Sequence, residues 1–267
     1  MTRLISEWID DIRISAKHKE ATLKEKTGLD YVSLAAKASG WSVADIERAA
    51  QQIKIGVVPV TSGEGIIGSF AEAVAAVTSV MGFRSFVTEC YDVSGIFEAH
   101  KREADILFMA DDDRYIAFNL NKKKMTDNNI ATAAGYLTAL EEAQGTLVGK
   151  EVLLLGFGIL GQEFLKRLKK KGISVTGYDT DENRLKAMGW SGASILEKIE
   201  DMQRYKLIID ATCQGGWIHQ GMLNPEAWIA SPGIPLSVDE KIYPDYEKRI
   251  IHDYLEIGTA TMLGFTL

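Results

Sequence analysis

The stretch Val152-Leu153-Leu154-Leu155-Gly156-Phe157-Gly158-Ile159-Leu160-Gly161 decides the fold of this 267-residue chain. Its apolar run predicts a buried strand, and three glycines with the spacing G-x-G-x-x-G follow at once. Residues 162–171 have the pattern of an amphipathic helix, and a second apolar segment, 173–178, ends at Asp179. This succession of strand, glycine turn, helix, strand and acid is the order that a dinucleotide-binding βαβ unit requires.

Each glycine of this turn has a separate physical task. Gly156 permits the tight bend, Gly158 lets the backbone approach a pyrophosphate, and Gly161 lets the following helix pack closely on the strand. The exposed N–H groups at the start of the helix face the phosphate charge, which the helix dipole also favours. The predicted cofactor-binding residues of the turn are therefore Gly156, Phe157, Gly158, Ile159, Leu160 and Gly161.

Asp179 distinguishes between the two nicotinamide dinucleotides. At the end of the second strand its carboxylate can accept hydrogen bonds from both adenosine ribose hydroxyls, and it would repel a 2′-phosphate. NAD is therefore the expected cofactor. Arg184 is close enough in sequence to weaken this preference, although a solvated helix residue is the simpler interpretation. The alternative to a dinucleotide site is a doubly wound domain that uses glycine only for close packing.

Two later segments are predicted to lie beside the nicotinamide half of the cofactor. A strand at 207–210 leads into a loop of small residues, which commonly covers the nicotinamide ribose, and a rigid turn at 231–235 follows the next strand. The predicted contacts are Ala211, Thr212, Cys213, Pro232 and Gly233. Covalent chemistry at Cys213 is the minor alternative, because no nearby base is evident.

Composition restricts the classes of function. The net charge is −7, with 46% hydrophobic and 25% charged residues, which indicates an ordinary globular protein and disfavours nucleic acid as a partner. Cys90 and Cys213 form no CxxC pair and the four histidines are scattered, so we expect no metal site and a reducing, cytoplasmic location. No signal peptide or apolar run long enough to span a membrane is recognised.

The first half begins with helices and then alternates between strands and helices. Residues 3–50 have helical spacing, interrupted at Gly28, and Ser42 is a predicted N-cap for a helix through Gln52. Residues 55–60 form a β-branched run that predicts a buried strand.

A hydroxyl- and glycine-rich turn, residues 61–70, follows that strand and precedes an alanine-rich helix that ends at Met81. Its N–H groups and the Ser62 hydroxyl could seat a carboxylate or phosphate, whereas the alternative is simple N-capping by Ser62. The sequence leaves both open. The turn lacks the lysine of a P-loop, which disfavours a nucleoside triphosphate.

Three acids follow the strand predicted at 105–109, at the carboxyl end where open α/β sheets bind ligands. Adjacent residues of an extended chain point to opposite sides, so at most two of them face a ligand. We predict that Asp111 points inward as the partner of a substrate ammonium group. Whether Asp112 helps Asp111 or only faces solvent is open, and the alternative is a polar turn in which Asp113 and Arg114 are exposed to water.

The remaining elements complete an α/β fold with an N-terminal helical segment and two α/β domains, the C-terminal one a Rossmann dinucleotide-binding fold. The expected elements are strands at 85–88, 115–119, 228–230 and 249–253, a polar loop at 121–129, helices at 130–143 and 195–202, and a C-terminal helix. The boundary is expected near Thr146. It would separate a helical lid and substrate-side domain at 1–146 from an NAD-binding domain at 147–267.

With these pieces placed, the chain resembles the PylD family of pyrroline-forming dehydrogenases in pyrrolysine biosynthesis. The stretches that carry the resemblance are Gly28-Leu29-Asp30, Gly56-Val57-Val58-Pro59-Val60-Thr61-Ser62-Gly63, Gly65-Ile66-Ile67-Gly68-Ser69-Phe70, Asp92-Val93-Ser94-Gly95, Met109-Ala110-Asp111-Asp112, Ser231-Pro232-Gly233-Ile234-Pro235 and Ile257-Gly258-Thr259-Ala260. The resemblance covers essentially the whole chain. It departs at 31–52, where this chain is longer, and at 184–202, and neither segment carries one of the motifs above.

The resemblance implies a reaction on an isopeptide. NAD-dependent oxidation converts the terminal amine of L-lysine-Nε-3-methyl-D-ornithine to an imine, and cyclisation with loss of ammonia and water gives pyrrolysine. By matching positions, Ser62 and Asp111 are the expected catalytic residues, in contact with the reacting amine or ring nitrogen, and Val60 is an expected substrate contact.

Three further substrate contacts are carried over from the same resemblance. Asn128 and Asp253 are assigned to other polar substrate atoms, with Asp253 standing where the family is expected to have the longer Glu. Leu4, on the first helix, is expected to pack over the substrate as part of a closing lid.

Two other functions stay open at this point. One is a generic NAD-dependent amino acid or imine dehydrogenase, and the other is a non-catalytic NAD-sensing protein. A sensor has no need for Ser62 and Asp111 near the nicotinamide, and acids at the strand ends favour an amine-bearing small molecule. The exposed Ile5 and Trp8 of the front end allow either a homodimer contact or closure of the site.

Overall fold

The computed structural model describes residues 4–267, so the start of the predicted helical region at residue 3 lies outside it. The chain divides into two compact units, each with its own β-sheet. The first unit comprises the residues up to Glu25, Leu29–Gly135 and Tyr254–Leu267, and the second comprises Lys26–Gly28 and Tyr136–Asp253.

Helices open the chain, as the sequence predicts. They are α1 (Ser6–Ile9), α2 (Ile12–Thr27), α3 (Tyr31–Ser39) and α4 (Val43–Gln52). Ser42 caps α4 in a reciprocal capping box, because its hydroxyl accepts from the Asp45 N–H while the Asp45 carboxylate accepts from the Ser42 N–H. The expectation that Leu4 lies on the first helix is wrong, since α1 begins only at Ser6.

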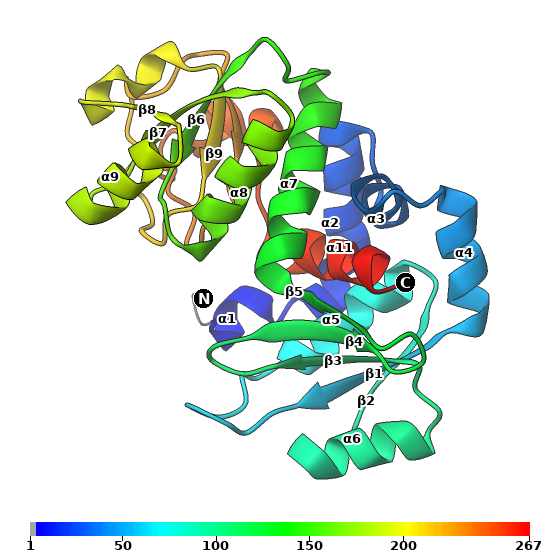
Figure 1. The fold of residues 1–267 in the computed structure, drawn as a ribbon. Helices are drawn as coiled ribbons and strands as arrows, with labels where there is room; N and C mark the ends of the chain where they lie inside the picture. The colour runs from blue at the N-terminus through cyan, green and yellow to red at the C-terminus, as the bar shows by residue number, and fades with distance from the viewer. Residues whose placement is uncertain (1–3) are drawn as a thin grey trace. The chain divides into compact units, whose positions relative to one another are not determined.

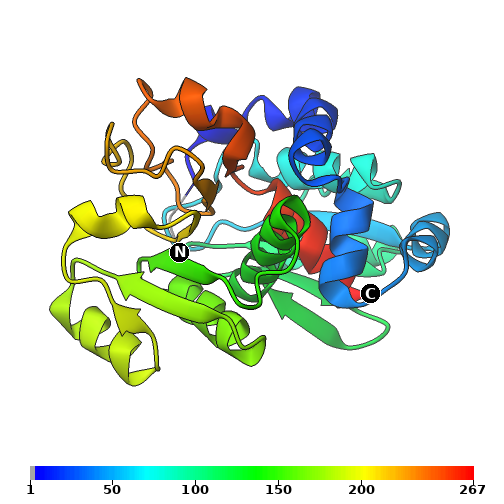
Figure 2. The same ribbon diagram turned by 90° about the horizontal axis from the view of Figure 1, so that it is seen from above.

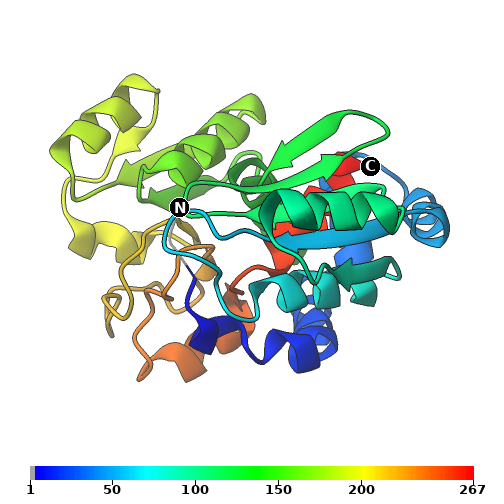
Figure 3. The same cartoon turned by 90° about the horizontal axis from the view of Figure 1, so that it is seen from below.

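The first sheet has the strand order β2-β1-β3-β4-β5. Its strands are β1 (Lys54–Pro59), β2 (Arg84–Val87), β3 (Ile106–Ala110), β4 (Tyr115–Asn119) and β5 (Lys124–Asp127). β1 pairs in parallel with β2 and β3, whereas β3, β4 and β5 pair antiparallel. α6 (Asp92–Lys101) covers one face, and α5 (Phe70–Val80) with the C-terminal helix α11 (Glu256–Thr266) covers the other (Figures 1 and 3).

Two local predictions are wrong. The stretch 121–129 is not simply a polar loop, because it contains β5, an edge strand in which only Thr126 is buried. The stretch 195–202 is not a helix, because Ile195 ends the short strand β8 (Ser194–Ile195) and the 3₁₀ helix η1 (Ile199–Arg204) follows. Neither β5 nor β8 has the apolar periodicity that identifies a strand, so pairing with a neighbouring strand decides them.

The C-terminal helix α11 belongs to the first unit, where it packs on α3 and α5. Small residues allow this close packing, since a Cβ atom on Gly264 would lie 2.8 Å from the Ala35 carbonyl oxygen. The division of the chain therefore differs from the expected domains 1–146 and 147–267. It falls inside α7 (Asn128–Gln144), and the chain returns to the first unit after Asp253, because α11 buries its apolar surface on elements from the start of the sequence.

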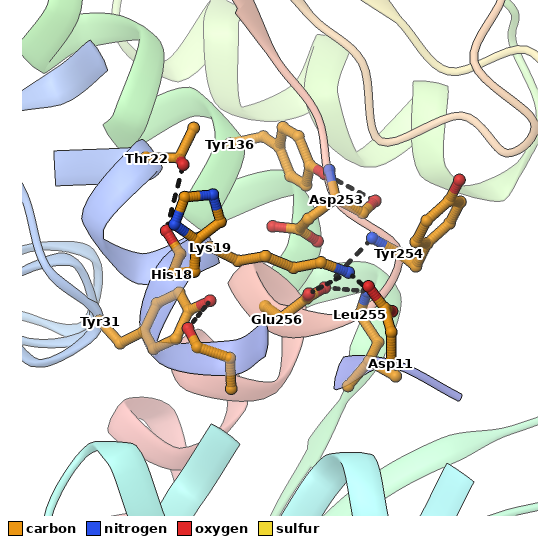
Figure 4. Close-up of polar contacts among 11 residues, drawn as sticks. Asp11, His18, Lys19, Thr22, Tyr31, Tyr136, Asp253, Tyr254, Leu255 and Glu256 are labelled. Carbon is orange, nitrogen blue, oxygen red and sulfur yellow. Dashed lines mark hydrogen bonds and ion pairs between the residues drawn. The ribbon is translucent and has the colours of Figure 1, made fainter. Parts of the chain in front are cut away.

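A buried ion pair holds the start of α11 to α2 (Figure 4). The Glu256 side chain is fully buried, and its carboxylate lies 3.2 Å from Lys19 Nζ. The same carboxylate accepts a hydrogen bond of 3.0 Å from the Leu255 N–H. Lys19 Nζ also lies 3.5 Å from the Asp11 carboxylate. Because a buried carboxylate without a counter-charge is costly, Lys19 compensates the burial of Glu256.

Lys19→Met is expected to lower the free energy of unfolding by about 2 kcal/mol, because the Glu256 charge stays buried without its ammonium partner. Denaturant unfolding at pH 7 measures the change. Lys24→Met is the matched control on the same helix, since Lys24 pairs with Asp30 in an exposed position and is expected to matter much less. Equal losses in the two variants would contradict the prediction.

The second sheet is entirely parallel, with the order β11-β10-β9-β6-β7-β8. Its further strands are β6 (Glu151–Leu155), β7 (Ser174–Tyr178), β9 (Leu207–Asp210), β10 (Trp228–Ala230) and β11 (Ile250–Ile251). In chain order this is the 3-2-1-4-5-6 arrangement of the Rossmann fold, as predicted, with its switch point between β6 and β9.

Helices α8 (Ile159–Lys170) and α9 (Glu182–Trp190) cover one face of this sheet (Figure 2). The other face is covered by the segment between β8 and β11, which includes η1, α10 (Tyr243–Tyr246) and the 3₁₀ helix η2 (Glu247–Arg249). Leu153, Leu155 and Ile208 are fully buried in the core on that face. A loop follows the carboxyl end of each of the strands β6, β7, β9 and β10.

Candidate active site

The glycine turn after β6 has the backbone that a phosphate site needs. Gly156 adopts φ +86°, which favours glycine. A Cβ atom on Gly161 would overlap the Gly156 carbonyl oxygen, whereas one on Gly158 would have no atom within 4 Å. Gly158 is the N-cap of α8 and supplies no side-chain cap, so the first N–H groups of that helix are available to an anion.

Asp179 follows β7 and faces this turn. Its carboxylate accepts a hydrogen bond of 2.6 Å from the Phe157 N–H and one of 2.9 Å from the Asp181 N–H. Each carboxylate oxygen has a second acceptor site, so capacity for a ribose hydroxyl remains. Arg184 is exposed and lies 3.9 Å from the Asp181 carboxylate, so the structure gives it an ion-pair partner other than Asp179.

The loops after β9 and β10 carry the predicted nicotinamide-side residues. Ala211 and Thr212 are half-buried, Cys213 is exposed and in no disulfide, and Pro232 and Gly233 are buried. A Cβ atom on Gly233 would overlap the Thr212 carbonyl oxygen, so the two loops are in direct contact. The structure therefore brings these five residues together at one edge of the second sheet.

In the first unit, two carboxylates hold the loop after β1. Asp92, the first residue of α6, accepts hydrogen bonds from the Thr61 N–H at 2.8 Å and the Thr61 hydroxyl at 2.5 Å. Asp112 accepts from the Glu64 N–H at 2.6 Å. Ser62 stands between the two anchored residues with an exposed side chain. The alternative in which Ser62 caps the next helix is wrong, because α5 begins at Phe70 with Ser69 at its N-cap.

The two hydrogen bonds from Thr61 lower the pKa of Asp92 below its usual value of 3.8. A carboxyl whose pKa is lowered on folding stabilises the fold above its unfolded pKa, and the stabilisation is lost as the pH falls through the folded pKa. Thr61→Val is therefore expected to lower Tm at pH 7, with the difference from the unchanged chain shrinking below pH 3.8. Thermal unfolding between pH 7 and pH 3 measures this, and a constant difference would contradict it.

A small cavity of 20 Å³ lies beside this loop, large enough for one water-sized group. Val60 and Asp111 both line it, together with apolar side chains that include Ile66, Ile67 and Phe70. The structure thus brings two predicted substrate residues, from the ends of β1 and β3, to one apolar cavity with a carboxylate at its wall.

The carboxylates of Asp111 and Asp112 accept hydrogen bonds from different loops. One Asp111 oxygen, Oδ1, accepts from the N–H groups of Asp113 at 2.9 Å and Arg114 at 2.7 Å, which closes the turn between β3 and β4. Its other oxygen makes neither of these bonds. Asp112 points to the loop after β1, and a Cβ atom on Gly63 would overlap its carboxylate. Asp112 therefore does not simply face solvent, because it holds the loop after β1.

The other three predicted substrate residues are more dispersed. Leu4 is half-buried just before α1. Asn128 begins α7, and its side-chain oxygen accepts a hydrogen bond of 3.0 Å from the Thr132 hydroxyl. Asp253 ends the second unit, where its N–H donates to the Tyr136 hydroxyl at 3.0 Å. Leu4 and Asn128 share the first unit with Ser62 and Asp111, whereas Asp253 does not.

The sequence assigned no role to two acids that organise these loops, Asp92 and Asp210, and left the role of a third, Asp112, open. In the sequence, Asp92 is part of the motif Asp92-Val93-Ser94-Gly95, and Asp210 ends the strand predicted at 207–210. The signal that could have identified Asp210 is a charged residue directly after the apolar run Leu207-Ile208-Ile209, with hydroxyl residues nearby in later loops.

Two further observations concern metal sites and membrane spans in the described chain. Within residues 4–267, no group of three or more His, Cys, Asp or Glu side chains is arranged to hold a metal ion. Over the same residues, no helix combines the length and the apolar character needed to cross a membrane.

The parallel 3-2-1-4-5-6 sheet, the glycine turn and the acid after β7 define a dinucleotide-binding protein of the Rossmann class. Solved structures agree with this fold. The shikimate 5-dehydrogenase of Thermus thermophilus, solved with NADP(H) and shikimate, has a TM-score of 0.53 and 13% identity, over 80% of this chain and 92% of that one. The quinate dehydrogenase of Corynebacterium glutamicum, solved with NAD, has a TM-score of 0.52 and 14% identity, over 80% and 93%.

Sequence relatives are more specific. The family model for the N-terminal domain of pyrrolysine biosynthesis protein PylD matches residues 9–126. The pyrrolysine synthase of Methanosarcina barkeri is 34% identical over 98% of this chain and 97% of its own length. That of Methanosarcina acetivorans is 33% identical over 98% of each. The chain belongs to the PylD family of pyrrolysine synthases, which confirms the resemblance found in the sequence.

Proposed function

We propose that this chain is an NAD-dependent amine dehydrogenase that forms pyrrolysine from L-lysine-Nε-3-methyl-D-ornithine. The observation that carries the proposal is the full-length kinship with two pyrrolysine synthases, at 34% and 33% identity. The carbon that bears the terminal amine loses a hydride, and that nitrogen loses a proton, to give an imine. The α-amine of the same ornithine part closes the ring as ammonia leaves, and any water that hydrolyses the imine is released again on ring closure.

NAD would supply the hydride acceptor of this reaction. The backbone of the turn from Gly156 to Gly161 would hold the pyrophosphate, and Asp179 the adenosine ribose. The turn has room for a pyrophosphate, because no atom lies within 4 Å of the place that a Cβ atom on Gly158 would occupy. No side chain caps the N-terminus of α8, so its N–H groups could bind the phosphates. The loop residues Ala211, Thr212, Cys213, Pro232 and Gly233 would flank the nicotinamide half.

On the substrate side, Asp111 would hold the terminal amine. Its Oδ2 is not used in the β3–β4 turn, and it lines an apolar cavity in which the attraction between a carboxylate and an ammonium group is stronger than in water. The Ser62 hydroxyl would hydrogen-bond the amine once it is neutral, and Val60 would pack on the adjoining carbon. Among residues 4–267, the side chains that line this cavity include no lysine or arginine, which favours a cationic substrate.

The remaining substrate contacts are proposed from the positions that match the family. Asn128 and Asp253 would bind polar atoms of the lysine part or of the ornithine α-amine. Leu4 would pack over the bound isopeptide and help to exclude water, as a residue of a lid does. Asn128 and Asp253 would make these substrate contacts in addition to their hydrogen bonds with Thr132 and Tyr136.

Asp179→Asn is expected to weaken NAD binding about tenfold and to narrow the preference for NAD over NADP, because a charged hydrogen-bond acceptor is lost and the 2′-phosphate is no longer repelled. Calorimetric titration with NAD and with NADP measures the two dissociation constants. Arg184→Ala is the control on the neighbouring helix and is expected to change neither constant. An unchanged NAD to NADP ratio in the asparagine variant would contradict the assignment of Asp179.

The experiment that tests the function follows absorbance at the reduced-nicotinamide band after the protein is mixed with NAD and the isopeptide, with products identified by mass. Formation of NADH with one equivalent of ammonia and a product of the mass of pyrrolysine supports the proposal. Tight NAD binding without reduction would rule out this substrate. Simple diamines and amino acids would then test for a generic amine dehydrogenase, and their failure would favour an NAD-sensing protein.

We place the enzyme in the cytoplasm, with a small molecule and not nucleic acid as its partner. The net charge of −7 and two cysteines in no disulfide support this placement. Ile5 is 44% exposed just before α1, and a homodimer that covers it is part of the proposal. Light scattering after gel filtration measures the mass in solution, and a monomer at micromolar concentration would contradict the dimer.

A further inference from the structure

We infer that Asp210 is a positioning residue that holds the nicotinamide-side loops in their binding conformation. The inference rests on the proposed function, because it takes NAD as the cofactor. Asp210 ends β9, and its side chain is fully buried. A carboxylate in such a place is costly unless it is well hydrogen-bonded, and in the described part of the chain no cationic side chain forms an ion pair with it.

Hydrogen-bond donors from two loops, the one after β9 and the one between β10 and α10, converge on this carboxylate. Oδ1 accepts from the Thr212 N–H at 3.1 Å and from the Thr212 hydroxyl at 2.6 Å. Oδ2 accepts from the Ser231 hydroxyl at 2.8 Å and from the Ser237 hydroxyl. An ionised carboxylate only accepts hydrogen bonds, so it satisfies all four donors at once, which an apolar or donating side chain at this position could not do.

Backbone contacts extend the same assembly. The Gly233 N–H donates to the Asp210 carbonyl oxygen at 3.1 Å, and the Gly233 Cα packs against the Thr212 carbonyl. The Ser231 carbonyl lies 2.7 Å from His252 Nδ1. The loop that starts at Ala211 and the turn from Ser231 to Pro235 are therefore joined through one buried residue, which holds them in a single relative arrangement.

The positions of β9 and β10 in the sheet indicate which part of the cofactor their loops would contact. Asp179 follows β7, on one side of the switch point between β6 and β9, and a strand-end acid there binds the adenosine ribose. β9 and β10 lie on the other side, so their loops flank the nicotinamide half. Because ordering a loop before the ligand arrives removes part of the cost of binding, Asp210 would raise affinity for the nicotinamide half without touching it.

Asp210→Asn separates this role from a general role in folding. Its side-chain oxygen can still accept from Thr212, and the hydroxyls of Ser231 and Ser237 can rotate to accept from the new amide group, so the variant keeps a filled core. We expect NADH to bind about tenfold more weakly and ADP-ribose, which lacks the nicotinamide, to bind within about twofold of the unchanged chain. Calorimetry with the full chain measures both ligands.

Ser237→Ala serves as a second, milder variant, since it removes one donor and leaves the charge and the other three hydrogen bonds. It is expected to show the same selective loss, at about threefold. Equal weakening of NADH and ADP-ribose in either variant, or no weakening in both, would overturn the inference while leaving the proposed function intact. Failure of the unchanged chain to bind NADH would instead contradict the proposed function, and the inference with it.

Discussion

Gly158→Ala is expected to raise the dissociation constant for NAD about a hundredfold while leaving the fold intact. Gly158 has φ −70°, which any residue adopts, and the position of its Cβ has no atom within 4 Å, so the protein itself accommodates alanine. In the proposed site, a pyrophosphate would approach the helix N-terminus through this open space. The added methyl group would therefore exclude the ligand without disturbing the protein.

Gly161→Ala is the matched comparison and is expected to fail by another route. Its Cβ atom would overlap the Gly156 carbonyl oxygen, so α8 must shift away from β6 and both Tm and NAD affinity should fall. Thermal unfolding and calorimetric titration of both variants test the pair. If Gly158→Ala leaves NAD affinity unchanged, the space beside Gly158 is not a phosphate site. If Gly158→Ala lowers Tm as much as Gly161→Ala does, the space beside Gly158 is not open in the folded protein.

Asp111→Asn is expected to lower kcat/KM for the isopeptide by at least about a hundredfold, because the substrate ammonium loses its counter-charge in an apolar cavity. The substitution is well suited to this test. Asparagine keeps the Oδ1 atom that accepts from the Asp113 and Arg114 N–H groups, so the β3–β4 turn is preserved and only the charge and Oδ2 change.

Asp113→Asn is the control for the same turn, since Asp113 is exposed and two residues further on. It should leave kcat/KM unchanged. Steady-state kinetics by NADH absorbance, with Tm as the check on folding, distinguishes the two variants. If Asp111 serves only to close the turn, Asp111→Asn will also have little effect, and the alternative of a merely structural polar turn will be correct.

The sequence alone was sufficient to locate the glycine turn and the following acid of the Rossmann fold. Gly156, Gly158, Gly161 and Asp179 lie within one βαβ unit, so their spacing is a property of adjacent elements. The same holds for the capping box that starts at Ser42. Where the physical cause is local, as with a left-handed backbone, a helix N-terminus or an apolar run, the pattern in the sequence identifies the structure.

The tertiary structure was needed wherever the partners are distant in sequence. α11 joins the first unit because its small residues fit against α3 and α5, and β5 is a strand only because β4 lies beside it. Asp92 and Asp112 anchor a loop about 30 and 50 residues earlier in the chain, and Asp210 accepts hydrogen bonds from two hydroxyls of the later connection between β10 and α10.

For this protein the sequence determined the fold class, the glycine turn and the family, whereas the packing decided where the chain divides and which acids line a cavity or hold loops. The reason is that a carboxylate's role depends on the donors that surround it. Asp111, Asp112 and Asp113 are adjacent and identical in sequence, yet one lines a cavity, one holds the loop after β1, and one is exposed.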